Sequence, residues 1–138
     1  MNSLIAPLGS TDLGMLVLRV VFAACVFKHG WGKVFHIEDL DKFWNVPVPI
    51  AWGVAAIQIF GALALALGFL TVPFALALAF VHAVATWKLI KMANEPFVAP
   101  SRHSWSIGLL YTLIPLVIAI AGPGKHSLDA ILFPRIIP

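Results

Sequence analysis

Charged residues are scarce in this chain of 138 residues, at 11% of the total, whereas hydrophobic residues make up 61%. A soluble domain carries roughly twice as much charge, so the composition argues against a soluble protein and indicates an integral membrane protein. The formal net charge of +3 is small and its cations are spread along the chain. It therefore gives no basis for nucleic-acid binding.

The chain has a single cysteine, Cys25, so it cannot form an internal disulfide or a CxxC redox pair. We expect Cys25 to be a small buried residue, because free cysteines usually pack as hydrophobic side chains. Lysine and arginine are absent from residues 1–12, and the basic region that begins a secretory signal peptide is therefore missing. We expect the first apolar segment to be retained as a helix.

Apolar segments long enough to cross a bilayer as helices, which takes about 17–25 residues, run over residues 13–35, 50–70, 73–92 and 104–122. The short connections between them require alternating directions. The sequence therefore predicts an all-α integral membrane protein, an antiparallel four-helix bundle that forms a single domain over residues 1–138. Gly61 and the spacing of Ala75, Ala79 and Ala83 favour close packing of the helices.

Two connections carry signals for turns and caps. Thr71 and Val72 are expected to link the second and third spans, and Pro73 suits the first turn of a helix. After the fourth span, Ser127 is expected to cap a short last helix that ends near Phe133.

The two membrane faces differ in composition. We call the face with both chain ends the terminal face, and the face with residues 36–49 and 93–103 the loop face. All five tryptophans lie toward the loop face, as one half of an aromatic belt: Trp31, Trp44, Trp52, Trp87 and Trp105. Most lysine and arginine residues lie there too, so the positive-inside rule favours a cytoplasmic loop face and external termini.

Arg19 needs a specific environment, because an arginine inside a spanning helix costs at least about 2.5–3.5 kcal/mol. No predicted span contains an acidic residue. The charge of Arg19 therefore requires carbonyl oxygens, water, or an anionic or carbonyl-bearing ligand. We expect Arg19 to face the interior of the bundle.

Each span contributes a polar residue at a similar depth. At about 1.5 Å per residue, Arg19 lies about 9 Å from the terminal face, His82 about 13 Å and Tyr111 about 16 Å. Gln58 lies at about 18 Å and His29 at about 24 Å. This convergence predicts a pocket that binds a cofactor. The alternative is that these side chains only hold the helices together.

Histidine also serves as a metal ligand, but the histidines of this chain show no suitable spacing. None of them are paired at i, i+3 or i, i+4, and they lie toward both faces: His29, His36, His82, His103 and His126. The sequence therefore predicts no metal site. An acidic residue inside a span, as proton pumps use, is also missing.

Three local patterns coincide: Leu18-Arg19 followed by FKHGWGK, IQIFGALALALGFLT at residues 57–71, and GPGKHSLDAIL at residues 122–132. Together they resemble the DoxX family of small four-helix membrane proteins. The family often has a glutamate where this chain has Gln58, an arginine where it has Val72, and an aromatic residue where it has His126. That glutamate would be a natural counter-ion for Arg19, so we expect Gln58 to be a neighbour of Arg19.

The resemblance implies a bacterial or archaeal cell membrane and a link with membrane redox systems. The family takes its name from a subunit of a thiosulfate:quinone oxidoreductase. The resemblance therefore favours a redox subunit that binds a quinone or similar lipid-soluble carrier. The hydrogen-bond donors would be Arg19, Gln58, His82 and Tyr111, while His29 would exchange protons with the loop face.

The chain carries no evident redox centre of its own, so electrons would come from a partner redox protein with a flavin, haem or thiol system. Two alternatives stay open, a non-enzymatic scaffold for the assembly of another complex and a small carrier for a solute or anion. The sequence does not decide whether the chain is itself an enzyme or whether it forms a homo-oligomer.

Overall fold

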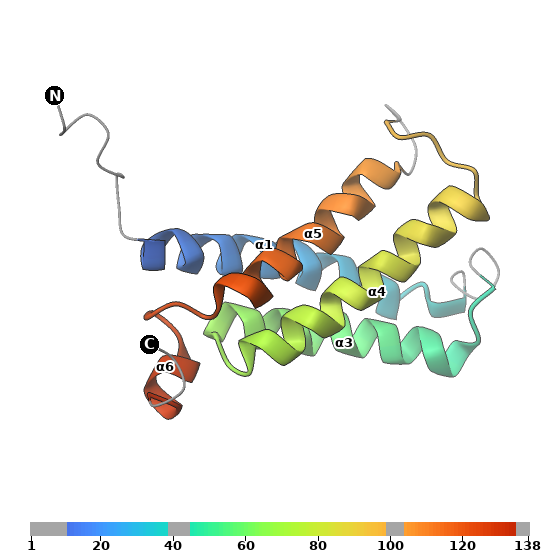
Figure 1. The fold of residues 1–138 in the computed structure, drawn as a ribbon. Helices are drawn as coiled ribbons and strands as arrows, with labels where there is room; N and C mark the ends of the chain where they lie inside the picture. Colours follow the sequence, from blue (N-terminus) through green and yellow to red (C-terminus); the bar gives the residue numbers. More distant parts are fainter. Residues whose placement is uncertain (1–10, 39–44, 99–103, 135–138) are drawn as a thin grey trace, which may run out of the picture.

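The computed structural model describes residues 11–38, 45–98 and 104–134. In this part of the chain, long helices lie side by side and a short helix lies at one end of them (Figure 1). The helices are α1 (Thr11–Val34), α3 (Val48–Leu67), α4 (Thr71–Lys91), α5 (Trp105–Ala121) and α6 (Leu128–Leu132). No strand occurs in the described residues. The predicted all-α, antiparallel four-helix architecture is confirmed.

The turn between α3 and α4 differs by a few residues from the prediction. α3 ends at Leu67 because Gly68 takes a left-handed conformation (φ 69°) and its N–H donates to the carbonyl of Leu65. α4 begins at Thr71, where the Asp129 carboxylate accepts hydrogen bonds from the N–H groups of Leu70, which precedes the helix, and of Thr71, its first residue. The link is therefore residues 68–70 rather than Thr71 and Val72.

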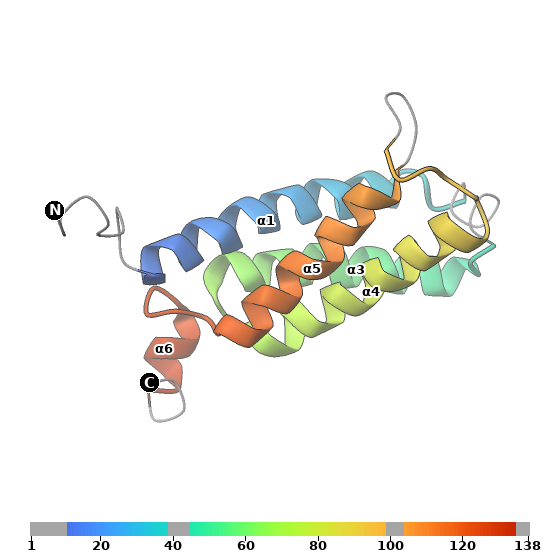
Figure 2. The same cartoon turned by 45° about the horizontal axis from the view of Figure 1, so that its top comes forward.

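The C-terminal segment closes the terminal face of the bundle, where α1 begins and α3 turns into α4 (Figure 2). The Asp129 carboxylate accepts from the N–H groups of Leu70 and Thr71 at 2.7 and 2.8 Å. The N–H of Asp129 donates to the carbonyl of Gly68 at 2.8 Å. Ser127 caps α6 as predicted, since its Oγ accepts from the N–H of Ala130 at 3.1 Å.

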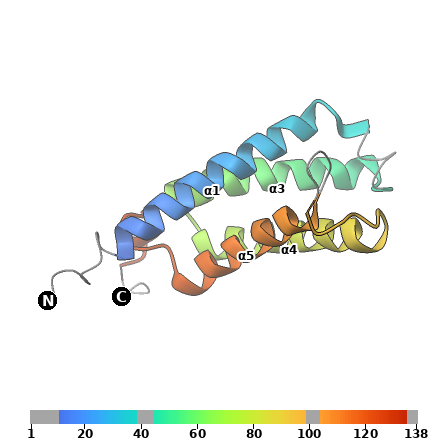
Figure 3. The ribbon, with the colours of Figure 1, turned by 90° about the horizontal axis from the view of Figure 1, so that it is seen from above.

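The long helices form two layers, α1 with α3 and α4 with α5, which contact each other mainly through α3 and α4 (Figure 3). The central core draws on all four helices: Phe22, Ala23, Val26, Ala62, Leu65, Ala75, Leu78 and Ile118. α1 and α5 make few contacts with each other. The bundle is therefore least tightly packed along the side between α1 and α5.

Glycine and alanine set the distances between neighbouring helices. A Cβ atom on Gly30 would lie 2.8 Å from the Cβ of Gln58, so α1 and α3 can approach this closely only because Gly30 has no side chain. Gly61 packs in the same way against the Leu78 side chain, and Ala75 and Ala79 are buried as expected.

The outer surface of the bundle is apolar. α1, α3 and α4 are long and apolar enough to cross a membrane, and α5 is apolar but shorter, with 17 residues. Phe80 is 70% exposed and Ile120 is 87% exposed on this surface. Such a continuous apolar surface is typical of contact with lipid tails rather than with water.

We expect Gly30→Ala to destabilise the protein, because the added methyl group would force α1 away from α3 at Gln58. The expected loss is about 1–3 kcal/mol of unfolding free energy, as for other overpacked cores. Gly32→Ala is the matched control, since a Cβ there meets nothing within 4 Å and alanine favours a helix by about 1 kcal/mol over glycine. Thermal unfolding in detergent compares the two. Equal melting temperatures would contradict the close approach of the helices.

We expect Asp129→Ala to destabilise the terminal face, because it leaves the N–H groups of Leu70 and Thr71 without their acceptor. The loss should be about 1–3 kcal/mol for each buried donor left unpaired. Asp129→Asn, which keeps one acceptor oxygen, should lose less.

Asp12→Asn serves as the control for this second prediction. The Asp12–Lys125 ion pair has an N–O distance of 3.7 Å and its lysine is largely exposed, so its removal should change stability by under about 1 kcal/mol. Chemical unfolding in detergent ranks the variants. If Asp129→Ala lost no more unfolding free energy than Asp12→Asn, the C-terminal segment would not hold the turn between α3 and α4.

Candidate functional site

A chain of hydrogen bonds crosses the bundle from α1 through α3 to α4. The Lys33 ammonium donates to Oε1 of Gln58 at 2.6 Å. Nε2 of Gln58 and Nε2 of His82 lie 3.1 Å apart, and Nδ1 of His82 lies 2.8 Å from the carbonyl oxygen of Leu78. Gln58 and His82 are both buried. These hydrogen bonds therefore satisfy polar groups whose burial without a partner would cost free energy.

The direction of every hydrogen bond in this series follows from the groups at its two ends, the Leu78 carbonyl and the Lys33 ammonium. The carbonyl of Leu78 can only accept, so Nδ1 of His82 carries the proton and Nε2 accepts from the Gln58 amide. The Lys33 ammonium can only donate, which places the amide oxygen of Gln58 toward it. Both ends thus require the same orientation of Gln58 and a neutral His82. The polar atoms of Gln58 and both ring nitrogens of His82 are engaged within the protein.

Three rings from three helices meet beside this chain. The ring centroids of His82 (α4) and Tyr111 (α5) lie 5.2 Å apart, those of His29 (α1) and Tyr111 lie 5.7 Å apart, and those of His29 and His82 lie 6.3 Å apart. These distances are typical of packed ring pairs. Gln58, His82 and Tyr111 therefore lie close together, and His29, which the depth count placed nearer the loop face, joins them.

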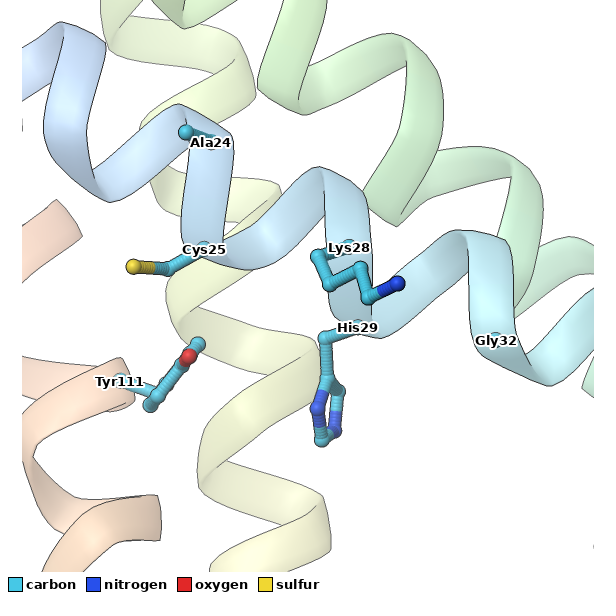
Figure 4. Close-up of a pocket in the computed structure, with 6 residues that line it drawn as sticks. All are labelled: Ala24, Cys25, Lys28, His29, Gly32 and Tyr111. Carbon is cyan, nitrogen blue, oxygen red and sulfur yellow. The ribbon is translucent and has the colours of Figure 1, made fainter.

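A groove of about 590 Å³ lies next to these rings on the open side of the bundle, between α1 and α5. Tyr111 comes from α5, and all other lining residues come from α1 (Figure 4): Ala24, Cys25, Lys28, His29 and Gly32. His82 and Gln58 lie behind the His29 and Tyr111 rings and do not line the groove. A ligand in the groove would meet His29, Tyr111 and Lys28 directly.

Side-chain direction explains why residues at different depths converge. A helical side chain leans toward the N-terminus of its own helix. α1 begins at the terminal face, so His29 and Lys33 lean inward from the loop face. α3 and α5 begin at the loop face, so Gln58 and Tyr111 lean the opposite way and meet them. A depth count that uses only Cα positions ignores this lean and therefore places His29 nearer the loop face than the other residues of the group.

The same rule places Arg19 apart from the other four candidates. Its side chain extends toward the terminal face, where Nη2 donates to the carbonyl of His126 at 2.6 Å and Nη1 packs against Gly68. Arg19 is fully buried, as expected, and a backbone carbonyl is its partner. The expected contacts with Gln58, His82 or Tyr111 are not formed, because Arg19 and His29 are separated by about 15 Å along α1. The negative charge of Asp129, outside the spans, acts on Arg19.

Sequence reasoning missed Lys33 and misplaced Cys25. Lys33 lies within about 80° of Arg19 and His29 on a helical wheel, a signal that could have identified it. Cys25 is exposed in the groove, contrary to the expectation of a buried residue, and its thiol lies beside the Tyr111 hydroxyl. The physical reason is that α5 does not cover this face of α1.

The fold and the site together define a small integral membrane four-helix protein with a groove on one side of the bundle. A model of the DoxX family matches residues 14–90, more than half of the chain, and the protein belongs to this family. The match includes every candidate site residue except Tyr111.

One curated relative is a Bacillus subtilis (strain 168) protein named "Putative oxidoreductase CatD". It is 28% identical over 129 residues, which cover 90% of each chain. No solved structure shows a significant match.

We expect Gln58→Leu to destabilise the protein by about 2–4 kcal/mol, because Lys33 and His82 both lose their partner and stay in a poorly solvated place. Gln58→Glu should lose less stability than Gln58→Leu, since a carboxylate would pair with the Lys33 ammonium while it removes the N–H that donates to Nε2 of His82. A double-mutant cycle of Gln58→Leu with Lys33→Met, measured by unfolding in detergent, tests the contact. The double variant should recover part of the loss. Strict additivity of the two single effects would show that the side chains do not interact.

Proposed function

We propose that this protein is a four-span membrane subunit of a redox system and binds a quinone or similar lipid-soluble carrier in the groove between α1 and α5. The observation that carries the proposal is the groove itself, with His29 and Tyr111 in a lateral opening of an otherwise apolar bundle. The groove has a volume of about 590 Å³ and is open to its surroundings over most of its extent. The oxidoreductase name of the Bacillus subtilis relative supports a redox role.

A quinone needs two kinds of surroundings, and the groove offers both. Its ring oxygens need hydrogen-bond donors, which His29 and Tyr111 supply from opposite walls. Its hydrocarbon tail needs an apolar path, which the open side between α1 and α5 provides toward the lipid. A ligand that enters sideways from the bilayer does not have to cross water.

The residues behind the groove hold its walls in place. The chain from Lys33 through Gln58 keeps the His82 ring neutral and oriented, and this ring packs on both Tyr111 and His29. His29 would exchange protons with the loop face, because an imidazole titrates near neutral pH. Electrons would come from a partner redox protein that carries a flavin, haem or thiol system.

Cys25 offers a direct test, because it is the chain's single cysteine and lies exposed in the groove. We expect a ubiquinone analogue with a fully substituted ring, which does not alkylate thiols, to slow maleimide labelling of Cys25 in detergent or nanodiscs by about fivefold or more at saturation. His29→Leu and Tyr111→Phe should reduce this protection, and Asp12→Asn, at the terminal face, should retain it.

Labelling after denaturation in SDS shows that the thiol is intact in each variant. If saturating quinone changes neither the labelling rate nor the tryptophan fluorescence, the groove is not a quinone site. The protein would then act as a scaffold for the assembly of a partner complex.

A further inference from the structure

The spanning part of the bundle carries positive charges at the groove without negative charges at the same depth. Beyond Asp12, α1 has no acidic residue, and α3, α4 and α5 have none. The carboxylates that the structure describes lie near the two ends of the bundle: Asp12, Glu38, Glu95 and Asp129. The cations near the groove are Lys28, which lines it, and Lys33 behind it.

Lys33 is half-buried in the last turn of α1 and its side chain is tied to the bundle. Its ammonium is held 2.6 Å from Oε1 of Gln58, and Gln58 is buried and tied to His82. The amide oxygen is a neutral dipole, so it satisfies a donor of Lys33 but leaves the positive charge uncompensated. A charge in poorly solvated surroundings acts over a longer range than in water.

Lys28 adds a second positive charge on the ligand's side. It lies exposed in the groove one residue before His29, and Gly32, one turn further along α1, leaves room beside it. The groove thus has a cation within reach of a ligand and a fixed cation behind its back wall. No carboxylate lines the groove among the described residues.

On the basis of the proposed function, we propose that the groove selects the anionic form of a quinone-type ligand, with Lys28 in contact with the ionised oxygen and Lys33 stabilising the charge from behind the His82 ring. The ligand class is a ring with one ionised hydroxyl group, such as a hydroxyquinone or a deprotonated quinol. Preorganised positive charge stabilises an anion strongly where water is scarce, because the protein need not reorganise around it. His29 and Tyr111 line the same groove.

Lawsone and its methyl ether provide a matched pair of ligands. Lawsone is a hydroxynaphthoquinone that is ionised at neutral pH, whereas the ether has nearly the same shape and no charge. Binding is measured by tryptophan fluorescence in phosphatidylcholine nanodiscs, with Cys25→Ala in every variant so that thiol addition to the ring does not contribute. We expect a Kd for lawsone about tenfold lower than for the ether, which corresponds to about 1.4 kcal/mol.

Lys28→Met and Lys33→Met should each raise the Kd of lawsone more than the Kd of the ether, so that the Kd ratio falls severalfold. Lys91→Met, an exposed lysine at the end of α4, is the control and should retain the ratio. If Lys33 had only a structural role, Lys33→Met would raise the Kd of both ligands by the same factor. If Lys33→Met does not fold, Lys28→Met alone must lower the ratio.

The outcomes separate the two proposals. If both ligands bind with equal Kd, or if the ratio survives both substitutions, the charge selection is overturned while quinone binding stands. If neither ligand binds, the proposed function itself fails. If phosphatidylglycerol in the nanodiscs abolishes lawsone binding, a lipid headgroup is the anion of this groove, and the assignment to a quinone-type ligand is overturned.

Discussion

Two cations on α1 constrain the whole bundle, and both are held by neutral oxygen atoms. Arg19 donates to the backbone carbonyl of His126, and Lys33 donates to the side-chain amide of Gln58. A lysine or arginine at membrane depth is costly unless it has such partners. The C-terminal segment must therefore fold back over the terminal face, and α3 must lie close to α1.

Two glycines, Gly30 and Gly68, lie where Lys33 and Arg19 find their hydrogen-bond acceptors. Gly30 lets α3 come close enough to α1 for Gln58 to reach Lys33, and Gly68 leaves room for the Arg19 guanidinium at the turn between α3 and α4. Asp129 then binds the free N–H groups at the start of α4 while its charge lies near Arg19. The same C-terminal segment thus caps the start of α4 and gives the buried guanidinium of Arg19 a hydrogen-bond acceptor and a nearby negative charge.

α1 packs closely against α3 on one side, and its other side, toward α5, is left uncovered. α1 pairs with α3 and α5 pairs with α4, so the side between α1 and α5 has no tight helix contact (Figure 3). Lys28, His29 and Tyr111 are exposed or half-buried along this side. The polar chain behind them holds the rings, and the groove in front of them opens toward the membrane. In the function proposed above, the ligand would arrive through the lipid on this open side.

The sequence by itself determined the membrane setting, the all-α class and most helix ends, because these depend on local properties: apolar length, proline and glycine, and the Ser127 cap. It also placed Arg19 inside the bundle, since charge is costly in lipid. Only the tertiary structure decided which helices pair, since helices that are apolar on nearly every face carry no stripe that identifies a partner. It likewise decided that Lys33, not Arg19, reaches Gln58, and that Cys25 is exposed, because those outcomes depend on side-chain direction and on the gap left between α1 and α5.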